Sequence, residues 1–145
     1  MNDDRLKLKN QLCFPLYACA REIIKAYKPY LDKLDLTYTQ YIVMMVLWEE
    51  KNITVKNLGE CLRLDSGTLT PLLKKLEGKL YVRRERSAED ERNLVVSITK
   101  TGELLKEQAR EVPMRMGSCV DLSKEEAKLL YTLLYKVLDH LDKSK

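Results

Sequence analysis

The chain has 145 residues, a length that fits one compact domain and can bury a core without disulfides or metals. Apolar residues make up 45% and charged residues 33%, while glycine and proline are scarce, which indicates a charge-rich globular protein and favours helices over a sandwich or a barrel. The net charge of +4 permits a nucleic-acid partner without requiring one.

No apolar run approaches the ~18 residues needed to cross a bilayer, and the acidic start of the chain does not resemble a secretory signal. We therefore expect a cytoplasmic protein with no membrane partner, whose four cysteines are reduced at rest. They form no CxxC pair and the chain has a single histidine, so we expect no metal site and no cofactor. Cys19 and Cys61 are expected to be buried as small hydrophobic side chains.

The first predicted helix covers about residues 10 to 34. Proline is tolerated in a first helical turn but not in a helix interior, so Pro15 predicts a regular start at residues 12 to 15, with Cys13 at the N-terminal end. A face suited to helix–helix packing is formed by residues that recur in steps of four and three, namely Cys13, Tyr17, Ala20, Ile24, Tyr27, Leu31 and Leu34.

Three shorter elements follow. A helix is predicted over residues 39–50, then an extended piece at Ile53, and then a helix that Thr54 caps. Asp65 or Ser66 can cap the next helix, which runs to about residue 77 and carries an amphipathic stripe formed by Leu69, Leu72, Leu73 and Leu76.

The rest of the chain begins with two predicted strands at residues 81–86 and 94–98, joined by a polar hairpin loop. Thr99 should cap a helix over about residues 100–115, with Pro113 near its end. Cys119 is then expected in a short polar connection, residues 115–121. A capping box formed by Ser123 and Glu126 opens a final helix to about residue 141.

Two short helices with a tight turn and a charged hairpin predict a mainly α protein with a small β-hairpin wing, a winged helix-turn-helix. We expect one domain over residues 1–145, with double-stranded DNA bound by residues 53–99. The outward face of the second helix carries small, hydroxylic and basic residues of the types that meet bases and phosphates: Ser66, Gly67, Thr68, Thr70, Pro71, Lys74 and Lys75.

Two further features support DNA binding. Residues 74–86 hold six cations against two acids, and Arg84 and Arg86 belong to this cluster. In the hairpin loop, Arg92 is suited to enter a narrow minor groove, and Asp90 is suited to orient it.

The stretch from Leu58 to Ile98 resembles the MarR family of bacterial regulators through Leu58-Gly59, the run LDSGTLTPLLKKLE at residues 64–77, and Asp90-Glu91-Arg92. The resemblance implies a homodimer whose helices at residues 1–36 and 100–145 interlock, and which binds a pseudo-palindromic operator. The chain departs from the pattern in having Leu80 where a glycine often ends the recognition helix.

The string Asn10-Gln11-Leu12-Cys13-Phe14, with Tyr17 and Tyr27, is similar to the thiol-based branch of that family, which includes the organic-hydroperoxide-resistance repressors. The resemblance implies that Cys13 reacts with the oxidant, that the tyrosines of the partner subunit hydrogen-bond its sulfur, and that oxidation releases DNA. A helix N-terminus and tyrosine hydroxyls both favour the reactive thiolate.

Cys119 matches the resolving cysteine of the two-cysteine members of the branch, whereas other members form mixed disulfides with a small thiol. Two alternative functions stay open. One is a regulator of the same fold that is released by a phenolic ligand in a pocket at the dimer interface. The other is a thiol peroxidase that uses the same nucleophile.

Overall fold

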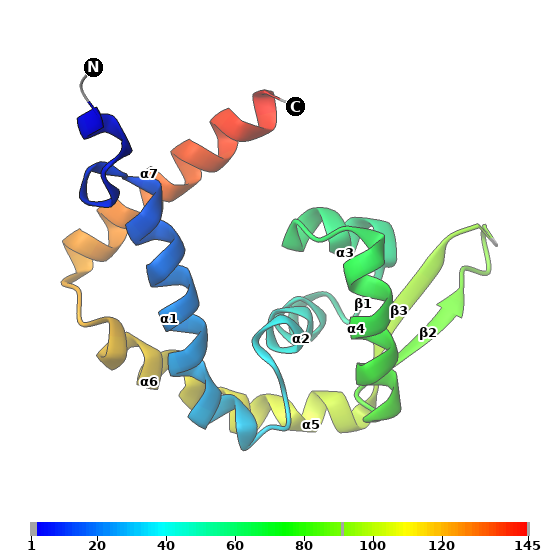
Figure 1. The fold of residues 1–145 in the computed structure, drawn as a ribbon. Coiled ribbons are helices and arrows are strands. Elements are labelled where there is room, and N and C mark those ends of the chain that lie inside the picture. The colour runs from blue at the N-terminus through cyan, green and yellow to red at the C-terminus, as the bar shows by residue number, and fades with distance from the viewer. Residues whose placement is uncertain (1–2, 91, 145) are drawn as a thin grey trace. The chain divides into compact units, whose positions relative to one another are not determined.

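The computed structural model describes residues 3–90 and 92–144, so Glu91 of the quoted hairpin motif lies outside the described part. The chain comprises two compact units, Met1–Val112 and Pro113–Lys145. The first unit begins with two short 3₁₀ helices, Asp3–Leu6 and Leu8–Asn10. It continues through α1 (Cys13–Asp32), α2 (Tyr38–Glu50), β1 (Asn52–Thr54), α3 (Val55–Leu62), α4 (Ser66–Gly78), β2 (Val82–Arg86), β3 (Leu94–Ile98) and α5 (Lys100–Ala109) (Figure 1).

Side-chain caps explain where the helices of this unit begin. Thr37 and Gln40 form a capping box at α2, one residue earlier than the sequence predicts. Thr54 accepts a hydrogen bond from the Asn57 amide at 3.1 Å and starts α3, as expected. Thr99 caps α5 in the same way.

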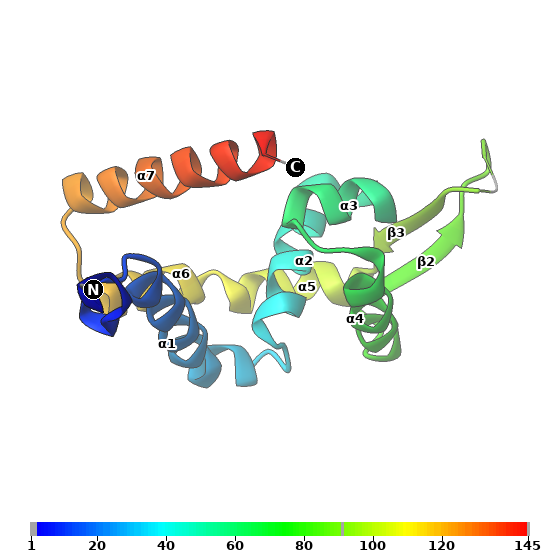
Figure 2. The same cartoon turned by 45° about the horizontal axis from the view of Figure 1, so that its top comes forward.

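The strands form a three-stranded antiparallel sheet in the order β1-β3-β2. The two predicted strands pair as a hairpin, with Arg84 opposite Val96 and Arg86 opposite Leu94. The extended piece at Ile53 pairs with Val96 on the other edge of β3, a pairing that its three residues were too few to predict. Figure 2 shows the hairpin of β2 and β3 projecting away from the helices of this unit, as a wing does.

The core of the first unit lies where α2, α3 and α4 meet β3. The helices and the hairpin of β2 and β3 confirm the predicted winged helix-turn-helix. The fully buried side chains of its core extend beyond the predicted stripe of α4. They include Val43, Met44, Leu47, Leu58, Leu69, Leu73, Leu76 and Val96.

The single helix predicted over residues 100–115 is wrong. The chain instead forms α5 and then α6 (Glu111–Val120), separated at Arg110. Proline cannot donate a backbone hydrogen bond, so a helix restarting at Glu111 places Pro113 in its first turn, where no donor is needed. Cys119 therefore lies in the last turn of a helix and not in a polar connection.

The second unit contains most of α6 and all of α7 (Lys124–Lys143). The predicted capping box of Ser123 and Glu126 begins α7, and it holds the pKa of Glu126 below its ordinary value because the Ser123 backbone N–H and hydroxyl bond the carboxylate. No helix in residues 3–90 and 92–144 is both long and apolar enough to span a membrane. Over the same residues, no cluster of three acidic, cysteine or histidine side chains is arranged to hold a metal ion.

Candidate nucleic-acid interface and thiol site

Helix α4 separates its buried and exposed faces as the sequence predicts. Leu69, Leu72, Leu73 and Leu76 are buried. The opposite face is exposed along the whole helix and carries all seven predicted residues, Ser66, Gly67, Thr68, Thr70, Pro71, Lys74 and Lys75. The structure thus brings this part of the predicted interface together on one surface.

The N-terminus of α4 is fixed by Asp65. Its carboxylate accepts a hydrogen bond from the Thr68 amide at 2.7 Å, and the bonds from Thr68 lower the pKa of Asp65. A Cβ added at Gly67 would meet only Asp65 Oδ1, at 3.4 Å, so packing does not require glycine there. The small residue and the proline at position 71 therefore shape an exposed surface rather than a packed one.

The C-terminus of α4 ends in a Schellman arrangement. The Tyr81 amide donates to the Leu76 carbonyl at 3.1 Å, and the Leu80 amide donates to the Glu77 carbonyl at 3.0 Å. Leu80 has a φ of 68°, the left-handed conformation that favours glycine. At the position where the chain departs from the MarR pattern, a leucine thus takes the backbone conformation of a glycine. The helix still ends at Gly78.

The wing tip holds Arg92 by three hydrogen bonds to one carboxylate. The Arg92 amide and Nε donate to Asp90 Oδ1 at 3.0 and 3.1 Å, and a terminal nitrogen donates to Oδ2 at 3.2 Å. These bonds lower the pKa of Asp90. The Arg92 side chain is 90% exposed, so it is both oriented and accessible. The predicted pairing of the two residues is present in the structure.

The two arginines predicted on β2 differ in their surroundings. Arg86 is exposed at the end of the strand. Arg84 is half-buried and pairs with Glu77 of α4, its terminal nitrogen 3.1 Å from the carboxylate, and this bond lowers the pKa of Glu77. Arg84 Nε is buried and bonds none of the described groups. Arg84 therefore ties the wing to the recognition helix.

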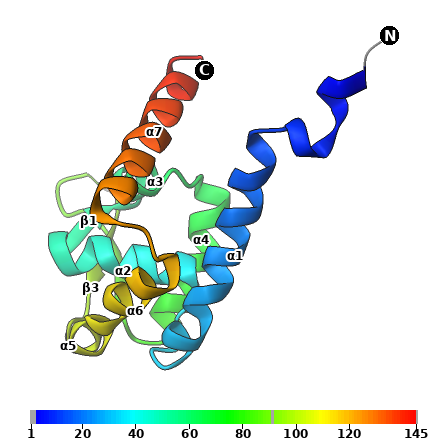
Figure 3. The ribbon, with the colours of Figure 1, turned by 90° about the vertical axis from the view of Figure 1, so that its left-hand side faces the viewer.

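Cys13 is the first residue of α1, as predicted, and its side chain is exposed. Pro15 lies in the first turn of the helix. One turn further on, the Tyr17 hydroxyl accepts a hydrogen bond from Arg21 at 3.3 Å, and the guanidinium lies 5.5 Å from the centroid of the Tyr17 ring. Figure 3 shows α1 running as one helix to the turn that leads into α2.

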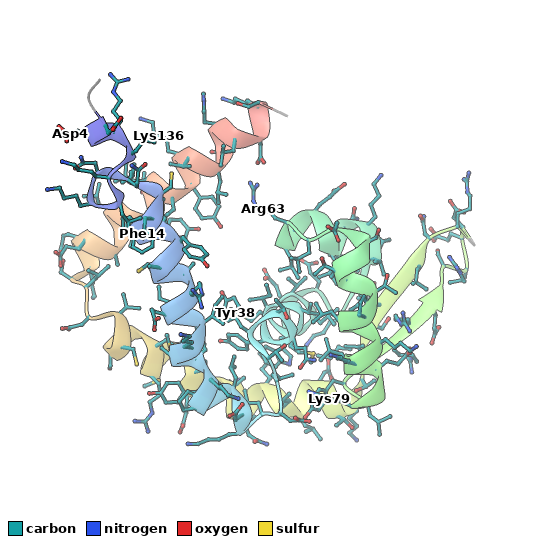
Figure 4. All side chains as sticks on the ribbon, in the orientation of Figure 1. Asp4, Phe14, Tyr38, Arg63, Lys79 and Lys136 are labelled. Carbon is teal, nitrogen blue, oxygen red and sulfur yellow. The ribbon has the colours of Figure 1, made fainter. Side chains whose placement is uncertain are left out.

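Tyr27 lies away from the thiol, in an aromatic cluster with residues of α2. Its ring centroid is 4.9 Å from that of Tyr38 and 5.8 Å from that of Tyr41. Figure 4 shows Tyr38 on the side of α2 that faces α1. Burial raises the pKa of Tyr27, and it raises the pKa of Tyr41 to about 12. Both hydroxyls therefore stay protonated and able to donate.

The separation of Tyr27 from Cys13 follows from helix geometry. Fourteen residues of an α-helix rise about 21 Å, so a Tyr27 hydroxyl cannot reach the sulfur of its own chain. Tyr17, one turn away, shares the face of Cys13.

The expectation that Cys19 and Cys61 are buried is wrong, because both side chains are exposed. Cys61 lies beside the buried face of α3 and not on it, since Leu58 and Gly59 form that face. Cys19 lies on α1 outside the region, around Leu31, that packs against the rest of the unit. Cys119 is also exposed.

Sequence reasoning missed two sets of contacts. The packing of Tyr27 against Tyr41 could not be read from spacing, because it joins two helices. The sequence places Lys79 in a basic cluster and Tyr81 in a strand, but both donate to backbone carbonyls of the turn between α1 and α2, at Asp35 and Leu34 respectively. The one signal in the sequence is Leu80 between them, which stands where a glycine often ends the recognition helix.

The structure combines a helix-turn-helix that has a polar recognition face with a β-hairpin wing, and an exposed thiol begins a separate helix. These features define a winged-helix transcriptional regulator. The sequence profile of the SarA/Rot transcriptional regulators matches residues 25–109. The organic hydroperoxide resistance transcriptional regulator of Bacillus subtilis is 51% identical over 141 residues, which are 95% of this chain and 94% of that protein.

Solved structures of AbfR are similar to the chain as well. Reduced AbfR bound to DNA matches with a TM-score of 0.80 and 38% identity over 97% of this chain and 99% of the other. Disulfide-formed AbfR matches with a TM-score of 0.67 and 35% identity over 96% and 95% of the two chains.

The chain belongs to the SarA/Rot family of transcriptional regulators. The predicted resemblance to the oxidation-sensing branch is confirmed by the similarity to the Bacillus subtilis regulator. Since the family consists of regulators, a thiol peroxidase is not supported as its function.

Proposed function

We propose that the chain is a dimeric repressor that binds operator DNA while Cys13 is reduced and releases it when an organic hydroperoxide oxidises Cys13. One observation carries the proposal: an exposed thiol begins α1, in a chain whose following elements build a winged helix with an open polar face. The name of the Bacillus relative supports the choice of oxidant. The proposal places the protein in the cytoplasm, where thiols are kept reduced.

The DNA contacts follow from the exposed surfaces. α4 enters the major groove, where Thr68, Thr70 and Lys74 reach bases and phosphates. Arg92, held by Asp90, enters the adjacent minor groove at the wing tip. Lys75 and Arg86 add phosphate contacts, whereas Arg84 contributes by fixing the wing through Glu77.

A second copy of the chain explains the apolar surface of α7. Its side chains are exposed at helical spacing, for example Leu129 at 61% and Leu133 at 49%. Such a stripe requires a partner, and the proposed dimerisation segments are residues 1–36 and 100–145. A two-fold dimer presents two recognition helices, which matches a pseudo-palindromic operator.

The chemical step is a two-electron oxidation of the thiolate. The Cys13 sulfur attacks an oxygen of the hydroperoxide, the S–O bond forms and the O–O bond breaks. The departing alkoxide takes up a proton and leaves as an alcohol, and Cys13 becomes a sulfenic acid. A thiol then condenses with the sulfenic acid to give a disulfide and one water.

Tyr17 and Tyr27 are proposed to hold the Cys13 thiolate by hydrogen bonds from the partner subunit. For Tyr27 the argument is geometric, since about 21 Å of helix separates it from Cys13 in its own chain. Its raised pKa keeps the hydroxyl protonated as a donor. The condensing thiol is proposed to be Cys119, with a small cellular thiol as the other candidate. The disulfide-formed state of AbfR supports the first choice.

Release of DNA on oxidation is tested by measuring binding to a DNA duplex that the reduced protein selects from a random library. Cumene hydroperoxide should release the wild-type protein and the Cys61→Ser variant, which lacks another exposed thiol. It should not release Cys13→Ser. Release of Cys13→Ser by peroxide would contradict the proposal, and its release by a phenolic compound alone would support the ligand-binding alternative.

The DNA arm is tested with Lys74→Ala and Arg92→Ala against Lys106→Ala, a change on the exposed side of α5. Each of the first two should weaken binding by about 1 kcal/mol or more and lower the salt dependence by about one counterion. The α5 control should change neither. Equal binding by all three variants would contradict the proposed face.

A further inference from the structure

The segment Lys79–Tyr81 joins the recognition helix α4 to the wing strand β2. Its three residues also contact the turn after α1, the first turn of α2 and the start of α5. Their contacts connect the element that reads DNA to the far end of the helix that begins at Cys13.

Lys79 forms the first link. Its Nζ donates to the backbone carbonyl of Asp35 and, at 3.0 Å, to Gln40 Oε1. Asp35 is left-handed with a φ of 54°, and its carboxylate lies 3.5 Å from the same Nζ. Gln40 is only 3% exposed and also caps α2 through the Thr37 amide. Figure 4 shows Lys79 between the lower end of α4 and this turn.

Tyr81 forms the second link, one residue after the left-handed Leu80. Its hydroxyl donates to the Leu34 carbonyl at 3.2 Å. Leu34 is 3% exposed and Leu31 is 2% exposed, so the end of α1 is anchored in the core beside this bond. Both links end on backbone carbonyls of consecutive residues and so hold the turn itself.

The third set of contacts holds the segment from its other side. The Thr99 hydroxyl donates to the Leu80 carbonyl at 2.5 Å, and the Thr99 amide donates to the Tyr81 carbonyl at 3.1 Å. At Gly102 an added Cβ would lie 2.3 Å from the Tyr81 carbonyl, so α5 packs tightly against this carbonyl. The segment cannot shift without moving the turn or α5.

We propose that Lys79 and Tyr81 are positioning residues that couple the C-terminal end of α1 to the recognition helix. α1 has 20 residues, about 30 Å of helix, with Cys13 at one end and the turn at the other. A displacement of α1 that follows oxidation of Cys13 is thereby transmitted to α4 and the wing. This inference rests on the proposed release of DNA by oxidation.

The test compares Kd for the selected duplex before and after cumene hydroperoxide. Tyr81→Phe removes only the hydroxyl, Lys79→Met removes the charge and keeps the aliphatic stem, and Lys106→Met is the control. In the double variant the reduced Kd should stay within about threefold of wild type. The factor by which oxidation raises Kd should then be about ten times smaller than in wild type, because the coupling is lost.

In protein that still unfolds cooperatively, an unchanged ratio of oxidised to reduced Kd would overturn the coupling. A merely structural role would give this result, because it would weaken the binding of both states equally. Tyr81→Phe alone should lower the ratio of oxidised to reduced Kd by a smaller factor. This single variant replaces the double variant in the test if the double variant fails to fold.

Amide hydrogen exchange of the reduced protein tests the link without peroxide. Lys79→Met should speed exchange both at residues 79–81 and at residues 33–36, because each segment holds the other. A change confined to residues 79–81 would contradict the link. If wild-type protein were not released by peroxide, the proposed function would fail while exchange still decided whether the link exists.

Discussion

At the scale of single residues, Leu80 adopts a backbone conformation that leucine rarely takes, and Cys13 begins a helix. The resemblance to the MarR family marks Leu80 as a departure where a glycine often ends the recognition helix. Its φ is 68°, while Gly78 stays within the helix. The sequence placed Cys13 at a helix start from a proline two residues later, and α1 begins there. A local backbone rule was sufficient for Cys13, whereas the family pattern was needed for Leu80.

Leu80→Gly should stabilise the protein. A left-handed conformation costs a non-glycine residue about 1–2 kcal/mol, and the extra freedom of glycine in the unfolded chain offsets part of this. Leu80 is 68% exposed, so little burial is lost. We expect a gain of about 0.5–1 kcal/mol in the free energy of unfolding in urea.

Leu80→Ala is the matched control, because alanine shortens the side chain without relieving the left-handed backbone. It should give no such gain. An alanine variant as stable as the glycine variant would show that side-chain exposure, and not the backbone, explains the effect.

Tyr27→Phe tests the proposed contact with the thiolate of the partner subunit. A hydrogen bond to a charged group contributes about 1.5–3 kcal/mol, so the loss should slow Cys13 oxidation by about tenfold or more. Trapping of the sulfenic acid over time measures the rate. Tyr131→Phe on α7 is the control, and a Tyr27→Phe rate within about twofold of wild type would contradict the contact.

At the scale of elements, caps and apolar stripes predicted the helices around the DNA-binding region. Thr54, Thr99 and Ser123 cap the helices that the sequence assigned to them. The prediction failed between residues 100 and 120, where the helical pattern continued across Pro113 and hid the break at Arg110. It also missed the pairing of β1, because pairing is a contact between distant segments.

The Asp65 cap makes the stability of α4 depend on pH. The Thr68 amide lowers the folded pKa of Asp65 below its ordinary value of 3.8. The stabilisation is therefore complete above that ordinary value and is lost as pH falls through the folded pKa. Asn also caps helices but does not titrate, so wild type should lose more stability than Asp65→Asn between pH 5 and about pH 2.5.

Urea unfolding midpoints at the two pH values measure this difference. Other carboxylates with lowered pKa values, such as Asp90 and Glu126, titrate in both proteins and cancel in the comparison. Midpoints that fall in parallel for wild type and Asp65→Asn would contradict the role of the cap.

At the scale of the whole molecule, the sequence predicted the class of regulator better than its working assembly. The recognition face is local to one helix and could be read from its pattern. Tyr27 lies in an aromatic cluster about 21 Å along α1 from Cys13, and the exposed leucines of α7 are unpartnered within their own unit. In the proposal, the Tyr27 hydroxyl bonds Cys13 of the partner subunit and the leucines of α7 pack against a second chain. A single sequence does not display such contacts between chains.

Whether oxidation of Cys13 causes release of DNA is decided by measuring both in the same sample. Reduced protein on a fluorescent duplex is titrated with cumene hydroperoxide below one equivalent, and aliquots are quenched for peptide mass spectrometry. We expect the released fraction to follow the modified fraction of Cys13 and not the modification of Cys19, Cys61 or Cys119 alone. Release of the duplex while Cys13 remains an unmodified thiol would contradict this expectation.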